Sequence, residues 1–116
     1  MWDHDNTFTS VDFPVGYNLR LNVLTRKIAA VPGLRARYLQ RLLDIAAAAD
    51  GWLAGQAEGE YRQIRESALG DPMKYHSNEA FEKAAAFIRH FARERTAIVR
   101  QSVARCHSQD CALFTQ

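Results

Sequence analysis

The feature that most constrains the fold is a helical spacing of apolar residues, interrupted at three places by proline, glycine and aspartate. The interruptions are Pro32-Gly33, Asp50-Gly51 and Gly70-Asp71-Pro72. Between them apolar side chains recur every three or four residues, which gathers them on one face of a helix. The pattern predicts a mainly α protein, with an irregular N-terminal loop at residues 1–20 followed by a small bundle of about four helices.

The first two predicted helices meet at Pro32-Gly33. The first has an apolar stripe that runs from Leu21 to Val31. The second begins at Pro32, because proline suits the first turn of a helix, and it ends before Asp50. A chain of 116 residues fits one domain, so residues 1–116 are interpreted as a single helical domain.

The third predicted helix is the weakest of the four. Gly51, Gly55 and Gly59 each cost about 1 kcal/mol relative to alanine in a helix interior, so the firm part is expected to begin at Ala57. It is expected to end at Leu69, before the Gly70-Asp71-Pro72 turn.

The fourth predicted helix opens with Ser77 or Asn78 as its N-cap. Its apolar face is long, and Arg95 interrupts it. The helical part is expected to span residues 21–105, and residues 106–116 are expected to form a tail.

Charge and cysteine usage narrow the class of protein. The formal charge of +2 is too small to indicate binding to nucleic acid or to anionic lipid. The chain has no signal peptide and no apolar run of about 20 residues, so the default expectation is a soluble, cytoplasmic chain without a membrane span. Cys106 and Cys111 are interpreted as free thiols in the tail, because a disulfide between residues five positions apart would close too small a loop to stabilise a core.

The chemically distinctive segment is the acidic opening, Asp3-His4-Asp5. In an extended segment alternate side chains point to the same side, so the Asp3 and Asp5 carboxylates can face one cation. Two hard oxygen donors suit Mg²⁺ or Ca²⁺ better than zinc. The sequence therefore predicts a metal site at Asp3 and Asp5.

Two familiar motifs share the spacing of Asp3 and Asp5, but the residues around this pair do not match either motif. Asp3, Asp5 and Thr7 resemble the Asp-x-Asp-x-Thr string of haloacid-dehalogenase-like phosphatases, which must follow a buried strand of a parallel sheet, and no such pattern is present. They also resemble the start of an EF-hand loop. That loop needs glycine at its sixth position and glutamate at its twelfth, where this chain has Phe8 and Pro14.

A third resemblance uses more of the chain. The segment from Trp2 to Phe8, Trp-Asp-His-Asp-Asn-Thr-Phe, resembles the Trp-Asp-x-Asp-x-Thr-Phe segment of the CotH kinase family, named for spore coat protein H. The stretch Leu24–Leu39, with its Val-Pro and Arg-x-Arg-Tyr-Leu pattern, is similar to a second stretch of that family. Tyr75, Phe81-Glu82 and the helix that holds Arg93-Glu94-Arg95 are similar to its closing helix.

The resemblance implies an atypical protein kinase, secreted or spore-associated, in which the acidic segment holds the Mg²⁺ that bridges the ATP phosphates. By this carry-over Asp3 and Asp5 are metal ligands, and Trp2 forms part of the adjoining cofactor-binding wall. Thr9 replaces the glycine that usually follows the Phe, which adds a side chain at a tight position. Because the family's nucleotide-binding lysine and catalytic acid lie upstream of this segment, the chain is expected to be a C-terminal fragment that is inactive alone.

The expected partners are a missing N-terminal kinase lobe or a protein substrate, with no nucleic acid and no membrane. Apolar surface that once faced the missing lobe would favour a homodimer. The competing hypothesis is a non-enzymatic helical interaction module, in which the acidic pair is a solvated turn. A haloacid-dehalogenase-like phosphatase fragment is the third and weakest interpretation.

Overall fold

The computed structural model describes residues 8–19 and 21–107, and within this part of the chain it contains helices and turns but no strand. The predicted mainly α fold, with an irregular N-terminal region and four helices, is confirmed. The helices are α1 (Val23–Ala30), α2 (Pro32–Ala49), α3 (Trp52–Gly70) and α4 (Asn78–His107).

Local sequence explains how α1 and α2 begin. The Asn22 side chain caps α1, because its Oδ1 accepts hydrogen bonds from the backbone N–H groups of Leu24, at 2.9 Å, and Thr25, at 3.3 Å. Pro32 opens α2, where its missing N–H costs nothing. The predicted bounds of α2 are confirmed, because the helix ends at Ala49 and the chain turns at Gly51, whose φ of 71° suits glycine.

The start of α3 differs from the prediction. The helix begins at Trp52, five residues before Ala57, and includes Gly55 and Gly59. The free-energy cost of placing Gly55 and Gly59 in a helix is therefore offset, and we attribute the offset to the packing of α3 against α4. At the other end, Lys74 Nζ donates to the Ala68 carbonyl at 2.8 Å and so satisfies one of the last backbone acceptors of the helix.

Helix α4 begins as predicted, with the Ser77 hydroxyl oxygen accepting from the Ala80 N–H at 3.1 Å. It runs to His107, so its last residues occupy the start of the predicted tail. The interpretation of Cys106 as a free thiol is wrong, because Cys106 is disulfide-bonded and lies against the buried core. The spacing of cysteines in a sequence bears on how much a bond would stabilise a core, but it does not decide whether a bond forms. Cys111 lies outside the described residues.

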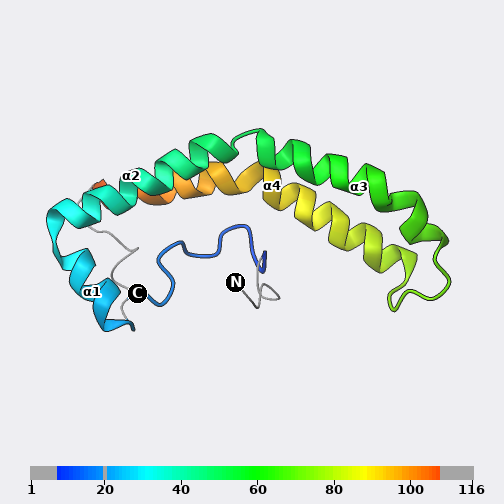
Figure 1. The fold of residues 1–116 in the computed structure, drawn as a ribbon, viewed down its shortest axis with the longest axis horizontal. Coiled ribbons are helices and arrows are strands. Elements are labelled where there is room, and N and C mark those ends of the chain that lie inside the picture. The colour runs from blue at the N-terminus through cyan, green and yellow to red at the C-terminus, as the bar shows by residue number, and fades with distance from the viewer. Residues whose placement is uncertain (1–7, 20, 108–116) are drawn as a thin grey trace.

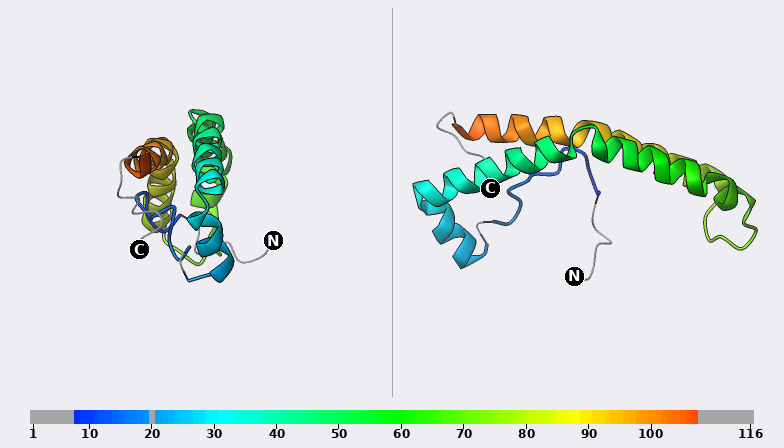
Figure 2. Two further views of the ribbon diagram at one scale, coloured as in Figure 1. Left: turned by 90° about the vertical axis from the view of Figure 1, so that its left-hand side faces the viewer. Right: turned by 45° about the horizontal axis from the view of Figure 1, so that its top comes forward.

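The helices form an elongated arch (Figure 1). Helices α2 and α3 follow one another along the arch, and α4 runs antiparallel beneath both, so the molecule has two layers (Figure 2). Helix α1 folds back at one end, and residues 8–19 lie on the concave side. The extents are 54 × 27 × 23 Å and the radius of gyration is 17.7 Å, against about 13 Å for a compact domain of this length.

The buried core is small because the arch is thin. One cluster of buried residues joins Leu39 of α2, 5% exposed, to Val103 of α4, 1% exposed. Val15, from the N-terminal segment, packs against this pair. None of the described helices combines the length and apolar character needed to cross a bilayer.

Candidate functional site

The residues predicted to bind metal and nucleotide, Trp2, Asp3 and Asp5, lie outside the described residues. Within the described part of the chain, no group of three or more histidine, cysteine, aspartate or glutamate side chains could hold a metal ion. The structure does describe residues 8–19, and residue 8 lies three positions after Asp5. We call residues 8–12 together with Phe91 and Arg95 the seat of the N-terminal segment.

The first contact of the seat is aromatic. Phe8 meets Phe91 of α4 edge to face, with ring centroids 5.0 Å apart and planes at 84°. This geometry lets the electron-poor edge of one ring face the electron-rich face of the other, which is worth about 1 kcal/mol beyond the buried area. Phe91 is 9% exposed, so the contact joins residue 8 to a buried position on the helix.

The backbone of Phe8 has a φ of 64°, in the left-handed region that a bulky side chain rarely adopts. Among the described non-glycine residues, only Asn18 shares a positive φ. The unusual backbone therefore falls at Phe8, one residue before Thr9, the position at which the family resemblance implies a tight backbone. The surrounding contacts must offset a conformational cost of about 1–2 kcal/mol at Phe8.

Arg95 supplies the strongest of these contacts. Its Nη1 donates a hydrogen bond of 2.7 Å to the carbonyl oxygen of Val11, which joins residues 84 positions apart. Its guanidinium lies 5.8 Å from the centroid of the Phe91 ring, near the outer limit of a cation–π contact. Burial lowers the pKa of Arg95, and the charge of Asp12 opposes that shift. An arginine remains charged, so the half-buried guanidinium must keep its partners.

Asp12 completes the seat as a solvent-facing carboxylate. The Ser10 hydroxyl donates a hydrogen bond to Asp12 Oδ1, and this bond is the main reason that the pKa of Asp12 is lowered. Its own backbone N–H and the Arg95 charge lower the pKa further. The seat is thus held by an aromatic pair and a charge-assisted hydrogen bond, and it contains no catalytic acid–base pair.

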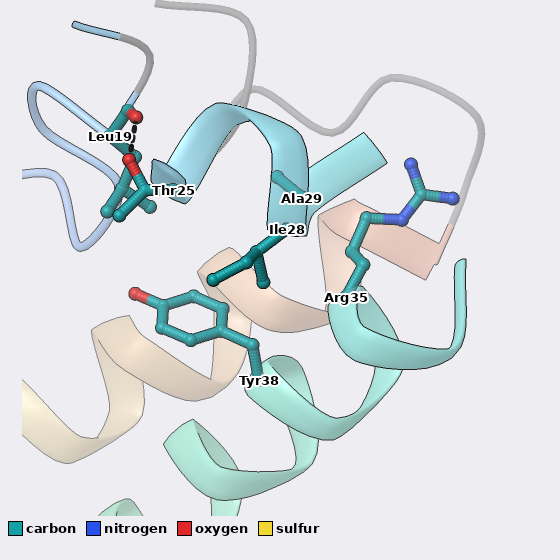
Figure 3. Close-up of a pocket in the computed structure, with 6 residues that line it drawn as sticks. All are labelled: Leu19, Thr25, Ile28, Ala29, Arg35 and Tyr38. Atoms are coloured by element: carbon teal, nitrogen blue, oxygen red, sulfur yellow. Dashed lines mark hydrogen bonds between the residues drawn. The ribbon is translucent and has the colours of Figure 1, made fainter. Parts of the chain in front are cut away.

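A second feature is a hollow of about 170 Å³ between α1 and α2, shown in Figure 3. It is lined by Leu19, Thr25, Ile28, Ala29, Arg35 and Tyr38. In Figure 3 Arg35 extends away from the Tyr38 ring, and the Thr25 hydroxyl donates to the Leu19 carbonyl. Burial raises the pKa of Tyr38. The hollow is smaller than a typical ligand pocket, and its lining suits packing rather than chemistry.

A third feature is a cluster of charges between α3 and α4. Tyr61 donates to Glu82 Oε2 at 2.6 Å, and Arg65 lies 2.8 Å from Glu82 Oε1. Arg89 lies 4.0 Å above the Tyr61 ring and 3.3 Å from Glu58. The hydrogen bond from Tyr61 is the largest cause of the lowered pKa of Glu82. Because each of these arginines faces a carboxylate, the cluster pins α3 to α4 and is not an anion site.

A fourth feature is an apolar groove of about 430 Å³ along α3 and α4. We call it the α3/α4 groove, and its lining is Trp52, Leu53, Gln56, Ala57, Glu60, Tyr61, Ile64, Phe81, Ala84, Ala85 and Ile88. Glu60 is the one charged residue in this lining. Few charged residues and many large aromatic and aliphatic side chains are typical of the centre of a protein interface.

Comparisons of the chain with protein-family models, with curated proteins and with solved structures give no match. The predicted metal ligands therefore stay a prediction. Sequence reasoning treated Arg95 only as an interruption of an apolar stripe, and it missed the seat that Arg95 forms. A charged residue in the middle of a long apolar face is the signal that could have pointed to a buried acceptor.

Proposed function

We propose that this chain is the C-terminal helical part of a CotH-like atypical protein kinase domain, which contributes the Mg²⁺-binding acidic segment and its support. In this proposal Asp3 and Asp5 bind the metal, and Trp2 lines the adjoining wall. The role of the helical arch in this proposal is to support the acidic segment.

The observation that carries the proposal is the seat of the N-terminal segment. The Phe8–Phe91 contact and the hydrogen bond from Arg95 to Val11 hold positions that lie three and six residues after Asp5. Three residues of chain span at most about 11 Å, so covalent reach keeps Asp5 within that distance of Phe8. A metal site needs such support, because its ligands must hold their geometry while the substrate moves.

The donor set of Asp3 and Asp5 fits Mg²⁺, because Mg²⁺ in phosphotransferases is held by one or two carboxylates with the substrate phosphates and water. When bound, the ion neutralises charge on the phosphates during transfer. The bond at Cys106 favours an oxidising compartment, as is typical of secreted proteins, and it agrees with the secretory family named above.

We further propose that this chain does not transfer phosphate alone. In the family that it resembles, the nucleotide-binding lysine and the catalytic acid precede the acidic segment. Phosphoryl transfer requires a phosphate clamp and a positioned acceptor in addition to the metal ligands, and the carboxylate pair supplies only the last of these.

Calorimetric titration of Mg²⁺, and then of ATP with Mg²⁺, tests the proposal. Wild-type chain is expected to bind the cation weakly, and the double variant Asp3→Asn/Asp5→Asn is expected to lose at least about tenfold in affinity, which is one step of 1.4 kcal/mol. The matched control is Glu66→Gln, an exposed acid of α3. Equal binding by the double variant and the control would exclude the acidic pair as the site. Tight, Asp3-dependent ATP binding would instead show that the nucleotide site is complete in this chain.

The second candidate function is a non-enzymatic helical interaction module, and the α3/α4 groove favours it. In that case Asp3→Ala and Asp5→Ala leave partner binding unchanged, and their effect on stability stays within about 0.5 kcal/mol. A change in partner binding on removal of either carboxylate would count against the module.

A further inference from the structure

Charge is distributed unevenly along the chain. Between Asp12 and Asp44 the sequence has no aspartate or glutamate, and the basic residues there are Arg20, Arg26, Lys27, Arg35, Arg37 and Arg41. The rest of the chain holds all 13 acids and nine of the 15 basic residues, so it is net acidic. The formal charge of +2 is therefore the sum of a strongly basic stretch and an acidic remainder. Because salt screens charges beyond roughly 8–10 Å, a partner responds to the local charge and not to this sum.

The basic stretch includes α1 and the first turns of α2, which form one end of the arch (Figure 1). We call residues 21–37 the basic hairpin. Helix α1 has no buried residue. Lys27, Arg35 and Arg37 are exposed, and within the described part of the chain they form no ion pair. Arg35 lines the same hollow as Ala29, so its positive charge lies beside α1 (Figure 3). These cations are available to an anionic partner.

The basic hairpin also exposes large aliphatic side chains. Leu21 is 77% exposed, Leu24 66% and Val23 53%. Val23 and Lys27 are four residues apart on α1, so an apolar and a basic side chain share one face of the helix. A helix that exposes aliphatic side chains together with lysine or arginine is typical of segments that lie on a membrane surface.

The type of apolar residue favours a bilayer over a macromolecular partner. Protein interfaces concentrate their binding energy in Trp, Tyr and Arg, and single-stranded nucleic acid stacks on aromatic rings. The large exposed apolar residues of the basic hairpin are all aliphatic, namely Leu21, Val23, Leu24, Ile28, Val31 and Leu34. Aliphatic side chains gain free energy on entering hydrocarbon, and cations gain it beside lipid phosphates. The boundary between headgroups and acyl chains offers both environments within about 5–10 Å.

We propose that the basic hairpin docks on the surface of a bilayer that contains anionic lipid. Its cations lie at the lipid phosphates, and the Leu21 and Leu24 side chains enter the boundary with the acyl chains. The hairpin lies on the bilayer and does not cross it, because α1 has 8 residues and a spanning helix needs about 20. The proposal differs from the expectation of no membrane partner, because that expectation rested on the net charge of the whole chain. It is independent of metal binding at Asp3 and Asp5.

Co-sedimentation of the full chain with lipid vesicles tests the proposal. Vesicles of phosphatidylcholine with about 30% phosphatidylserine are expected to bind the wild type, and pure phosphatidylcholine vesicles are not. Each cation near such a surface is worth about fivefold in affinity, so Lys27→Gln/Arg35→Gln is expected to weaken binding about 30-fold. Leu21→Gln/Leu24→Gln is expected to weaken it at least about tenfold. The matched control is Lys83→Gln/Arg93→Gln, which removes two exposed cations of α4 and is expected to bind as the wild type does.

A wild-type chain that binds neither kind of vesicle, or binds both equally, overturns the proposal. Equal weakening by the α4 pair overturns it as well, because the net charge and not the basic hairpin would then govern binding. Full affinity in the leucine variant contradicts insertion. A chain that ignores vesicles and binds poly-glutamate instead overturns the bilayer and leaves the surface to an acidic protein. Circular dichroism checks the fold of each variant, and two variants at different positions keep the test valid if one of them unfolds.

Discussion

The three glycines around the start of α3 give the sharpest test of the fold, because the structure and the sequence pattern disagree there. Gly55 and Gly59 lie inside the helix, and a Cβ built on either meets no atom within 4 Å. Alanine removes the entropic cost of glycine in a helix, about 0.8–1.0 kcal/mol per residue, and nothing in the surroundings opposes it. The double variant Gly55→Ala/Gly59→Ala is therefore expected to be more stable by about 2 kcal/mol.

Gly51 is the matched control. It also has open space around a built Cβ, but its φ is 71°, so alanine there must adopt a left-handed backbone at a cost of about 1–2 kcal/mol. Gly51→Ala is expected to destabilise the protein. Space is the same at all three positions, so the opposite signs isolate the backbone conformation as the cause.

Thermal unfolding followed by circular dichroism at one fixed protein concentration measures both effects, since association would make the midpoint depend on concentration. The double variant is expected to melt about 8 °C or more above the wild type, from roughly 4 °C per kcal/mol for a domain of this size. If α3 began at Ala57, as the sequence pattern predicts, Gly55 would lie in a loop. An unchanged or lower midpoint for Gly55→Ala would then refute the helix bounds described above.

Three further substitutions test the core, the seat and the end of α2. Val103→Ala removes two buried methyl groups at a position 1% exposed and is expected to cost about 2 kcal/mol by urea denaturation, whereas a loss below 0.5 kcal/mol would contradict the core assignment. Arg95→Met deletes the bond to the Val11 carbonyl, and amide exchange in residues 8–19 is expected to quicken at least tenfold while α3 is unchanged. Equal exchange would show that the bond does not hold the segment. The Arg100 side chain, 2.8 Å from Asp50, lowers the pKa of that carboxyl below 3.8. The stabilisation that the ionised Asp50 carboxylate gives the fold is therefore complete above pH 3.8, and it is lost as the pH falls through the lowered pKa of Asp50. The difference in melting temperature between wild type and Asp50→Asn is thus expected to close on acidification. A gap in melting temperature that does not narrow at all as the pH is lowered below 3.8 would contradict this cause.

Much of the fold could be predicted from the sequence because backbone chemistry marks the helix ends. Pro32 and Gly51 fix the limits of α2, and Ser77 caps α4, all through local effects that residue type decides. The start of α3 could not be predicted in this way. Intrinsic propensity argued against a helix through Gly55, and packing against α4 overrides it.

The position of Arg95 on an apolar face could point to a buried acceptor, but its identity could not be predicted, because Arg95 and Val11 are 84 residues apart and neither lies in a repeating pattern that points to the other. The disulfide at Cys106 could not be predicted either, because the spacing of cysteines in a sequence does not decide whether a bond forms. The acidic pair Asp3 and Asp5 has a recognisable donor chemistry, and its role as a metal site stays a prediction.

The central claim is that a metal bound by the acidic opening lies beside the seat on α4. Mn²⁺ takes the same oxygen ligands as Mg²⁺ and broadens nearby nuclear magnetic resonance signals, so titrating Mn²⁺ while observing the Phe91 ring tests the claim directly. Selective broadening of the Phe91 signals is expected, which Asp3→Asn/Asp5→Asn abolishes and Glu66→Gln leaves intact. Broadening of Phe91 that persists in the double variant, or that is absent in the wild type, would contradict it.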